Sequence, residues 1–210
     1  GDALPAAVLG RPATAVTGGG LFFCARLDTS QVKCWGWNPN GQLGIGTTEN
    51  QGDDPGEMAA LPVTIALQPV YRPDGLLRRA AFAFVGNDVH NTTGTGQTRS
   101  ATVGNQGAAT FTLRAQNDGN FTDALRIRGT GTTSRFTVTY RRGATNITAQ
   151  VLAGTYTLPG VAPGRTRDIT VVIRARAGTP AGTTVSRTIT TRSGTNPAIR
   201  DTVKATITRR

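Results

Sequence analysis

The sequence has few of the residues that most often carry chemistry. Its 210 residues include one histidine, one methionine and two cysteines, and Glu49 and Glu57 are the only glutamates. Catalysis requires positioned acids, bases or nucleophiles, and the sequence contains no G-x-S-x-G, H-E-x-x-H or phosphate-loop motif. The single histidine, His90 in NDVHNTTG, is interpreted as an exposed or capping residue. We therefore expect a protein that is not an enzyme and has no cofactor.

Long apolar runs are also absent. A membrane-spanning helix needs about 18 or more consecutive apolar residues, and no stretch approaches that length. The apolar residues instead form short β-branched runs separated by Gly, Asn, Asp and Thr, in a chain with 27 Gly and 11 Pro. This pattern predicts an all-β protein without a membrane span.

Lysine is scarce, and the charge is unevenly distributed. Lys33 and Lys204 are the only lysines, so the other basic residues are arginines. Residues 1–80 contain six basic and seven acidic side chains (net −1), whereas residues 81–210 contain seventeen and five (net +12), which together give the total of +11. A charge step near residue 80 supports a domain boundary there. We predict two domains, residues 1–75 and 76–210.

The most specific motif is CWGWN followed by GQLG, from Cys34 to Gly44. With the preceding LFFCARL it resembles one repeat of the RCC1 family of seven-bladed β-propellers, in the secreted bacterial style with paired cysteines, over about Ala13 to Leu67. No second W-G-x-N-x-x-G-Q-L-G occurs in the chain. The resemblance therefore implies a single RCC1-like blade or hairpin module. Guanine-nucleotide exchange is rejected, because full propellers of that family need many blades.

The two cysteines lie in a predicted hairpin. LFFCARL and QVKCWGW read as strands, and residues 28–30 supply turn formers between them. If Cys24 lies opposite Cys34, Arg26 faces Val32 and the turn closes consistently. Opposed positions of an antiparallel pair suit a disulfide, so we predict a Cys24–Cys34 bridge and an oxidising compartment. The alternatives are two reduced core cysteines or, less favoured because no second Cys pair exists, a metal site.

A single blade has too little interior to be stable alone. Repeat architectures of this kind need about three units before a continuous core forms. The second domain, the N-terminal segment or other copies of the same chain must then cover its apolar surfaces. The side chains expected to pack or assemble the blade are Phe22, Phe23, Trp35, Trp37 and Leu43.

The second half alternates apolar residues with Thr and Arg along long strands, which predicts an antiparallel two-sheet sandwich with one buried face per sheet. It resembles bacterial immunoglobulin-like modules of the CARDB or NEW3 type over about Gly104 to Arg210, in ATFTLRAQNDGN and VAPGRTRDITVVIRA. That resemblance implies a fold and an extracellular habitat. Residues 78–94 would supply the first strand. The inward-facing set is Phe111, Leu113, Ala115, Leu125, Ile127, Phe136, Val138, Tyr140, Ile169, Val171, Ile173, Val203, Ala205 and Ile207.

The arginines of the sandwich suggest a polyanion as a partner, because arginine binds phosphate and carboxylate well. Acidic polysaccharide is favoured over nucleic acid, since the interleaved aromatic residues of single-strand binders are missing. The alternative interpretation is a solvated surface. The candidate contacts are Arg114, Arg126, Arg128, Arg174 and Arg176.

The Asp53-Asp54 pair, near Glu49 and Glu57, is the densest acidic cluster in the sequence. Oxygen ligands of this kind suit a hard cation such as Ca²⁺. A solvated loop is the favoured interpretation, and no metal site is predicted.

These observations lead to a hypothesis about function. We expect a secreted or cell-surface structural protein that associates with itself as a surface-layer, pilus-like or filament subunit, through its incomplete blade and terminal strands. The alternative is an adhesin-like module that binds acidic glycan or another polyanion.

Overall fold

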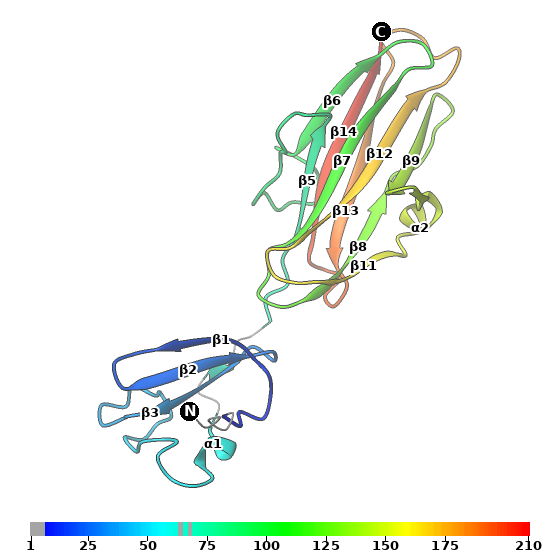
Figure 1. Ribbon diagram of the computed structural model, residues 1–210. Helices are drawn as coiled ribbons and strands as arrows, with labels where there is room; N and C mark the ends of the chain where they lie inside the picture. The colour runs from blue at the N-terminus through cyan, green and yellow to red at the C-terminus, as the bar shows by residue number, and fades with distance from the viewer. Residues whose placement is uncertain (1–6, 63–64, 67–68) are drawn as a thin grey trace. The chain divides into compact units, whose positions relative to one another are not determined.

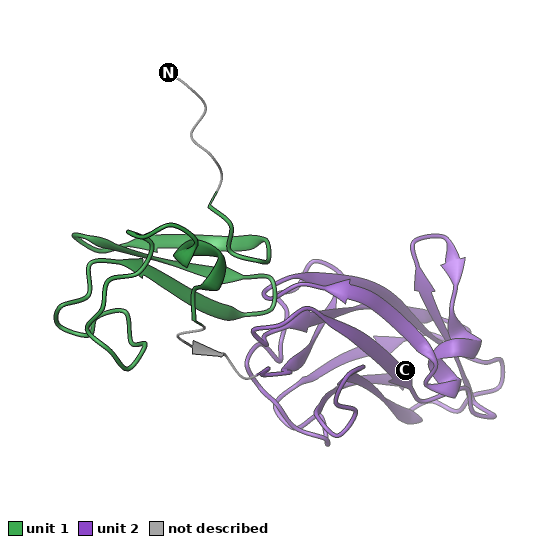
Figure 2. Cartoon of the chain, turned by 90° about the horizontal axis from the view of Figure 1, so that it is seen from below, with its two compact units in different colours: residues 1–68 green, residues 69–210 purple. Residues whose placement is uncertain are grey.

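The computed structural model describes residues 7–62, 65–66 and 69–210 (Figure 1). The chain divides into two compact units, residues 1–68 and residues 69–210 (Figure 2). The sequence predicts a boundary between residues 75 and 76. In the structure, Pro73–Gly75 pair with Ala115–Asn117 of the second unit. Neither helix in the described part of the chain has the length and hydropathy that crossing a membrane would require.

The first unit is a four-stranded antiparallel sheet in the order β1-β2-β3-β4. Its buried core is small and consists of Leu9, Ala25, Leu27 and Leu61, with Trp35 and Met58 packed against it. The resembling repeat was predicted to reach Leu67, which lies outside the described residues. The elements are β1 (Ala13–Gly18), β2 (Phe22–Leu27), β3 (Gln31–Gly36), α1 (Glu57–Ala60) and β4 (Ile65–Ala66).

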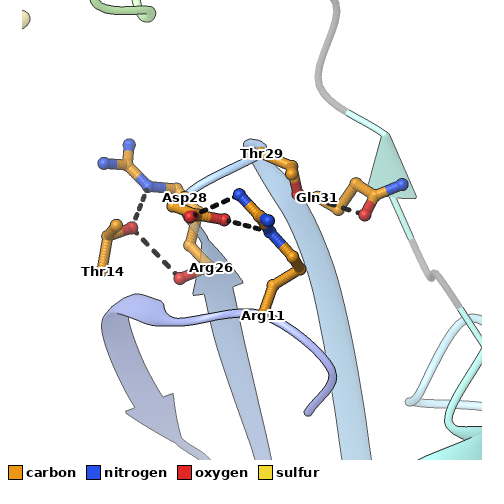
Figure 3. Close-up of polar contacts among 6 residues, drawn as sticks. All are labelled: Arg11, Thr14, Arg26, Asp28, Thr29 and Gln31. Atoms are coloured by element: carbon orange, nitrogen blue, oxygen red, sulfur yellow. Dashed lines mark hydrogen bonds and ion pairs between the residues drawn. The ribbon is translucent and has the colours of Figure 1, made fainter.

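Polar contacts fix the chain at the end of the β2–β3 hairpin (Figure 3). Arg11 donates to both carboxylate oxygens of Asp28, at 3.0 and 2.8 Å. The Thr14 hydroxyl donates to the Arg26 carbonyl and accepts from Arg26 Nε, both at 3.1 Å. These bonds hold the segment before β1, and β1 itself, against β2.

The second unit is a sandwich of two five-stranded sheets, in the orders β10-β9-β12-β7-β5 (the β12 sheet) and β11-β8-β13-β14-β6 (the β13 sheet). All strand pairs are antiparallel except β6 with β14, which is parallel. The short helix α2 (Thr148–Ala153) lies beside β8 and β9 (Figure 1). The strands are β5 (Pro73–Arg79), β6 (Thr98–Val103), β7 (Ala108–Asn117), β8 (Asp123–Gly129), β9 (Phe136–Arg142), β10 (Thr145–Asn146), β11 (Tyr156–Val161), β12 (Thr166–Ala175), β13 (Thr184–Ser193) and β14 (Arg200–Arg209).

The core of the sandwich confirms the inward-facing set predicted from alternation. All fourteen of those side chains belong to one buried cluster between the sheets, each at most 4% exposed. Successive residues of a strand point to opposite faces of its sheet, so the intervening Thr and Arg residues lie on the outer faces. The all-β fold with a two-sheet sandwich is therefore confirmed.

The first strand of the sandwich differs from the prediction. Residues 78–94 were expected to form it, whereas β5 begins at Pro73 and ends at Arg79. The chain then forms a long loop over residues 80–97, which makes one β-bridge to β5, between Leu77 and Val85. Burial explains the shift, because Leu76 and Leu77 are buried whereas Phe82 is 61% exposed.

Candidate functional site

The predicted disulfide is confirmed. Cys24 on β2 lies directly opposite Cys34 on β3, with Arg26 opposite Val32 as the spacing required. The two sulfurs are bonded, and the Cα atoms are 4.1 Å apart. The bridge links the two central strands of the small sheet.

The predicted packing residues of the first unit divide into two groups. Leu43 is fully buried, whereas Phe22 and Trp35 are half-buried. Phe23 is 50% exposed and Trp37 47% exposed. The rings of Phe23 and Trp35 stack across the hairpin with centroids 6.0 Å apart. The blade-like sheet therefore leaves a large aromatic surface uncovered by the described residues of its own chain.

Sequence reasoning missed Asn38, which organises the loop after β3. Its side chain is completely buried. Its amide nitrogen donates to the carbonyls of Thr47 and Glu49, both at 2.8 Å, and its amide oxygen accepts from the Leu43 N–H at 2.8 Å. The asparagine of the CWGWN motif is the signal that could have pointed to it.

Two carboxylates of the acidic loop of the first unit, those of Glu57 and Asp53, accept hydrogen bonds within the loop. Glu57 Oε2 accepts from the backbone N–H groups of Gly52, Asp53 and Asp54, at 2.7, 3.2 and 3.1 Å. Asp53 Oδ2 accepts from the side chain of Asn50. These bonds cap the turn that precedes α1.

The five candidate arginines do not share one surface. Arg126 and Arg128 lie on β8 of the β13 sheet, and both are exposed. Arg114 and Arg174 lie in the β12 sheet, and Arg176 directly follows it. The alternation of residues along each strand predicted that all five face away from the core. Alternation does not reveal which of the two sheets a strand belongs to, so it could not show that these arginines lie on different faces.

A row of arginines crosses the outer face of the β13 sheet. Arg192 on β13 is directly opposite Arg126 on β8 and directly opposite Arg200 on β14. Beside this row is a shallow groove of about 500 Å³. No acidic side chain lines it: the lining residues are Thr92, Arg128, Gly129, Thr130, Thr188, Thr190, Arg192, Arg200 and Thr202.

A second cluster, which the sequence did not predict, lies at the end of the sandwich where β5 begins and β7 ends. Asp74 is the second residue of β5, Asp118 follows β7 directly, and His90 lies in the loop 80–97. Their potential ligand atoms all lie within 4.8 Å of one another. No signal joined them, because the three residues share no motif and are brought together only by the pairing of β5 with β7 and by the path of the loop.

The electrostatics of this cluster are unusual. Asp74 is completely buried. The pKa of Asp74 is raised to about 7, chiefly by burial; the hydrogen bond from the Asp88 N–H lowers it, and the neighbouring carboxylates of Asp201, Asp118 and Asp88 contribute to raising it. A negative charge at this position is therefore poorly stabilised by the protein alone.

Comparison with known proteins gives one partial family match. Residues 13–42 match the family described as "Regulator of chromosome condensation (RCC1) repeat", which supports the repeat resemblance of the first unit. No curated protein matches the chain. The immunoglobulin-like resemblance of the second unit stays a prediction.

Several solved structures are similar to parts of the chain. A FixG-related protein from Vibrio parahaemolyticus has 11% identity and a TM-score of 0.39, covering 67% of this chain and 99% of that chain. The secreted serine protease VesC from Vibrio cholerae has 15% identity and a TM-score of 0.33, covering 53% of this chain and 21% of that one. The VesB protease of Vibrio cholerae has 13% identity and a TM-score of 0.33, and the match covers 90% of this chain and 49% of that chain.

Proposed function

We propose that the chain is a non-enzymatic extracellular structural protein that associates with further copies of itself through its first unit. The observation that carries this proposal is the uncovered aromatic surface of the blade-like sheet. Phe23 and Trp37 are each about half exposed, and Val16 and Leu21 are 62% and 65% exposed. Four large exposed apolar side chains within residues 16–37 are more than a small unit of this kind exposes without a partner, and such exposure is a feature of protein interfaces.

The free edge of β1 gives this association a geometry. Within the described residues β1 pairs only with β2, and all six of its residues are exposed. The strand reads ATAVTG and has neither a charge nor a proline, two of the features that natural proteins use to block an open edge. Its register with β2 is irregular only between Ala13 and Ala15, so Ala15–Gly18 form a regular edge. A second copy can add its own edge strand there by ordinary backbone hydrogen bonding. The disulfide supports an oxidising, extracellular location.

We propose that the copies associate through the first unit and not through exchange of the last strand, β14. β14 already lies between β13 and β6, with register partners on β13 for residues 200–208 and on β6 for residues 204–209. Exchange of β14 between copies would therefore require the centre of the β13 sheet to open. The β1 edge needs no such rearrangement.

Light scattering or analytical ultracentrifugation over a range of concentrations tests the proposal. Val16→Lys places a charge on the β1 edge and should lower the association, while Phe82→Lys, at a position 61% exposed in the second unit, is the matched control. A wild-type chain that stays monomeric with its disulfide formed contradicts the proposal. Equal association of the two variants contradicts the choice of edge.

We propose, as a second and separate function, binding of an acidic polysaccharide on the outer face of the β13 sheet. The observation that favours it is the row formed by Arg126, Arg192 and Arg200. Like charges directly opposite one another destabilise a sheet. The two ion pairs among the described residues are Arg11–Asp28 and Arg114–Asp168, so neither neutralises this row.

The spacing of the row suits a polymer with repeated acidic groups. Neighbouring strands lie about 4.8 Å apart, so the three arginines are regularly spaced across the sheet. The groove beside them adds Arg128 and several threonine hydroxyls, which can accept and donate hydrogen bonds to sugar hydroxyls.

Chromatography on immobilised heparin with a salt gradient tests this second function. The double variant Arg126→Gln/Arg200→Gln should elute at lower salt than the wild type, because each lost cation reduces counterion release. Arg174→Gln/Arg176→Gln, on the β12 side, has the same change of charge and is the control. Equal shifts for both pairs would indicate only a general effect of net charge and contradict a site on the β13 sheet.

A further inference from the structure

The cluster of Asp74, His90 and Asp118 contains carboxylate oxygens that lack partners although they are buried. Asp74 is completely buried; its Oδ2 accepts from the Asp88 N–H at 3.0 Å, but its Oδ1 has no donor among the described residues. Asp118 Oδ1 accepts from the Gln116 side chain, and its Oδ2 is likewise buried without a donor. An unpaired buried carboxylate oxygen carries a large desolvation cost.

The guanidinium group of Arg72 lies near this cluster, but it does not offset the desolvation cost of the unpaired carboxylate oxygens. Arg72 Nε donates to His90 Nε2 at 2.7 Å, and Arg72 forms no ion pair with either carboxylate within the described part of the chain. In this hydrogen bond the lone pair of His90 Nε2 is the acceptor. A metal ion that uses this nitrogen would replace Arg72 there.

A buried network around Asp201 fixes the positions of two of the three residues, Asp74 and His90. Asp201 Oδ2 accepts from the Gly75 N–H, next to Asp74, at 2.9 Å. Its Oδ1 accepts from the Asn91 N–H, next to His90, at 3.0 Å and from Gln97 at 2.7 Å. One fully buried side chain of β14 thus ties both β5 and the loop 80–97 in place. Such supporting bonds are what hold metal ligands in a defined orientation.

We propose that Asp74, His90 and Asp118 bind one divalent transition-metal ion. Imidazole nitrogen together with carboxylate oxygen is a donor set used by zinc and manganese, whereas calcium prefers oxygen ligands alone. The ion supplies the positive charge that the two orphaned oxygens lack. Because tetrahedral ligands at zinc distances lie about 3.4 Å apart, the side chains would draw together from their present separation of up to 4.8 Å.

The accumulation of negative charge supports the proposal independently. Asp88, Asp118 and Asp201 all lie near enough to Asp74 for their negative charges to act on it. This accumulation lies within a unit whose net charge is strongly positive. Two of the four, Asp74 and Asp201, are completely buried, and buried negative charge is costly unless a cation compensates it.

Isothermal titration of the tag-free chain, stripped with a chelator, tests the site. ZnCl₂ should bind with a stoichiometry of one per chain and raise the unfolding temperature of the sandwich. The variants Asp74→Asn, His90→Gln and Asp118→Asn should each weaken binding by about tenfold or more. The matched control is Asp53→Asn/Asp54→Asn, which removes two carboxylates from the capped loop of the first unit and should leave the titration unchanged.

Each contrary result has a defined meaning. No saturable zinc binding by the wild type, or full binding by Asp118→Asn and His90→Gln, overturns the site. Saturable calcium binding at the same concentration, lost in the same variants, overturns the assignment to a transition metal. Circular dichroism in the presence of chelator checks that each variant is folded; if Asp74→Asn is not, the two less buried ligands decide the outcome.

Discussion

Arg114 and Asp168 face each other across β7 and β12 in a two-pronged ion pair. Arg114 Nε lies 2.9 Å from Asp168 Oδ1, and its terminal nitrogen lies 3.0 Å from Oδ2. The same guanidinium lies 4.3 Å from the centroid of the Phe84 ring, which also contacts Arg78 at 4.7 Å. The charge of Arg114 is therefore committed within the chain and does not belong with the uncompensated row on the β13 sheet.

The substitution Arg114→Gln follows from this pairing. It should lower the free energy of unfolding by about 0.2–1 kcal/mol, since the pair is partly exposed and screened by solvent. Its elution from heparin should change less than that of Arg126→Gln. Urea unfolding and the salt gradient measure the two effects, and a larger loss of heparin retention in Arg114→Gln would contradict this division of the arginines.

The disulfide predicts independent behaviour of the two units. Cys24→Ser/Cys34→Ser should destabilise the first unit by about 2–4 kcal/mol, the usual range for a native disulfide. The sandwich should be unaffected, because both cysteines of the chain lie in the first unit. Differential scanning calorimetry with and without reductant measures this. A second transition that moves together with the first would contradict independent unfolding.

The sandwich core could be predicted because alternation along one strand is local information. Ile169, Val171 and Ile173 occupy alternate positions of β12, and their burial follows from the two-residue period alone. The choice of strand partner depends on residues far apart in the sequence. For example, β6 pairs in parallel with β14, which is the last strand of the chain. Parity could not show that Arg114 and Arg126 lie in different sheets.

The cluster at Asp74 illustrates why the candidate site itself could not be predicted. His90 lies in the segment 78–94, which was expected to supply the first strand of the sandwich, and it was interpreted as an exposed or capping residue. Its position depends on Asn91 and on Asp201, a residue of the last strand. Only the long-range pairing of β5, β7 and β14 creates the cluster, whereas the Cys24–Cys34 bridge lies within one hairpin and could be read from spacing.

Tyr140 predicts an alkaline sensitivity of the sandwich. Burial raises the pKa of Tyr140 above its ordinary value of about 10, and the charge of Arg187 only partly opposes this. The folded chain then keeps a proton that the unfolded chain loses, so the free energy of unfolding should fall as the pH rises above about 10. Tyr140→Phe should reduce this decline, as measured by urea unfolding between pH 9 and about 11.5.

At neutral pH the same variant reports a single hydrogen bond. The Tyr140 hydroxyl donates to the Thr130 carbonyl at 2.9 Å. Its removal should cost about 0.5–1.5 kcal/mol. Tyr156→Phe, at a half-buried position on β11, is the control for loss of a hydroxyl. If the two variants lose equal stability and equal alkaline sensitivity, the buried hydroxyl of Tyr140 is not the cause.

Asn38→Ala should release the loop that follows β3. The substitution removes two bonds to the carbonyls of Thr47 and Glu49 and one from the Leu43 N–H. Leu43 is itself a fully buried residue of this loop. The Leu43 N–H and the two carbonyls that lose their partner therefore cannot all reach water. The first unit should lose about 2–4 kcal/mol.

The exposed neighbour Asn40 provides the control for this substitution, since Asn40→Ala changes the same residue type in the same loop. Calorimetry of the first transition and hydrogen exchange of the Leu43 amide measure the effect. The exchange rate of the Leu43 amide should rise steeply in Asn38→Ala and not in Asn40→Ala, because the Leu43 N–H donates to the side-chain oxygen of Asn38. Unchanged protection of that amide would mean that the glycine turns, and not the buried asparagine, hold the loop.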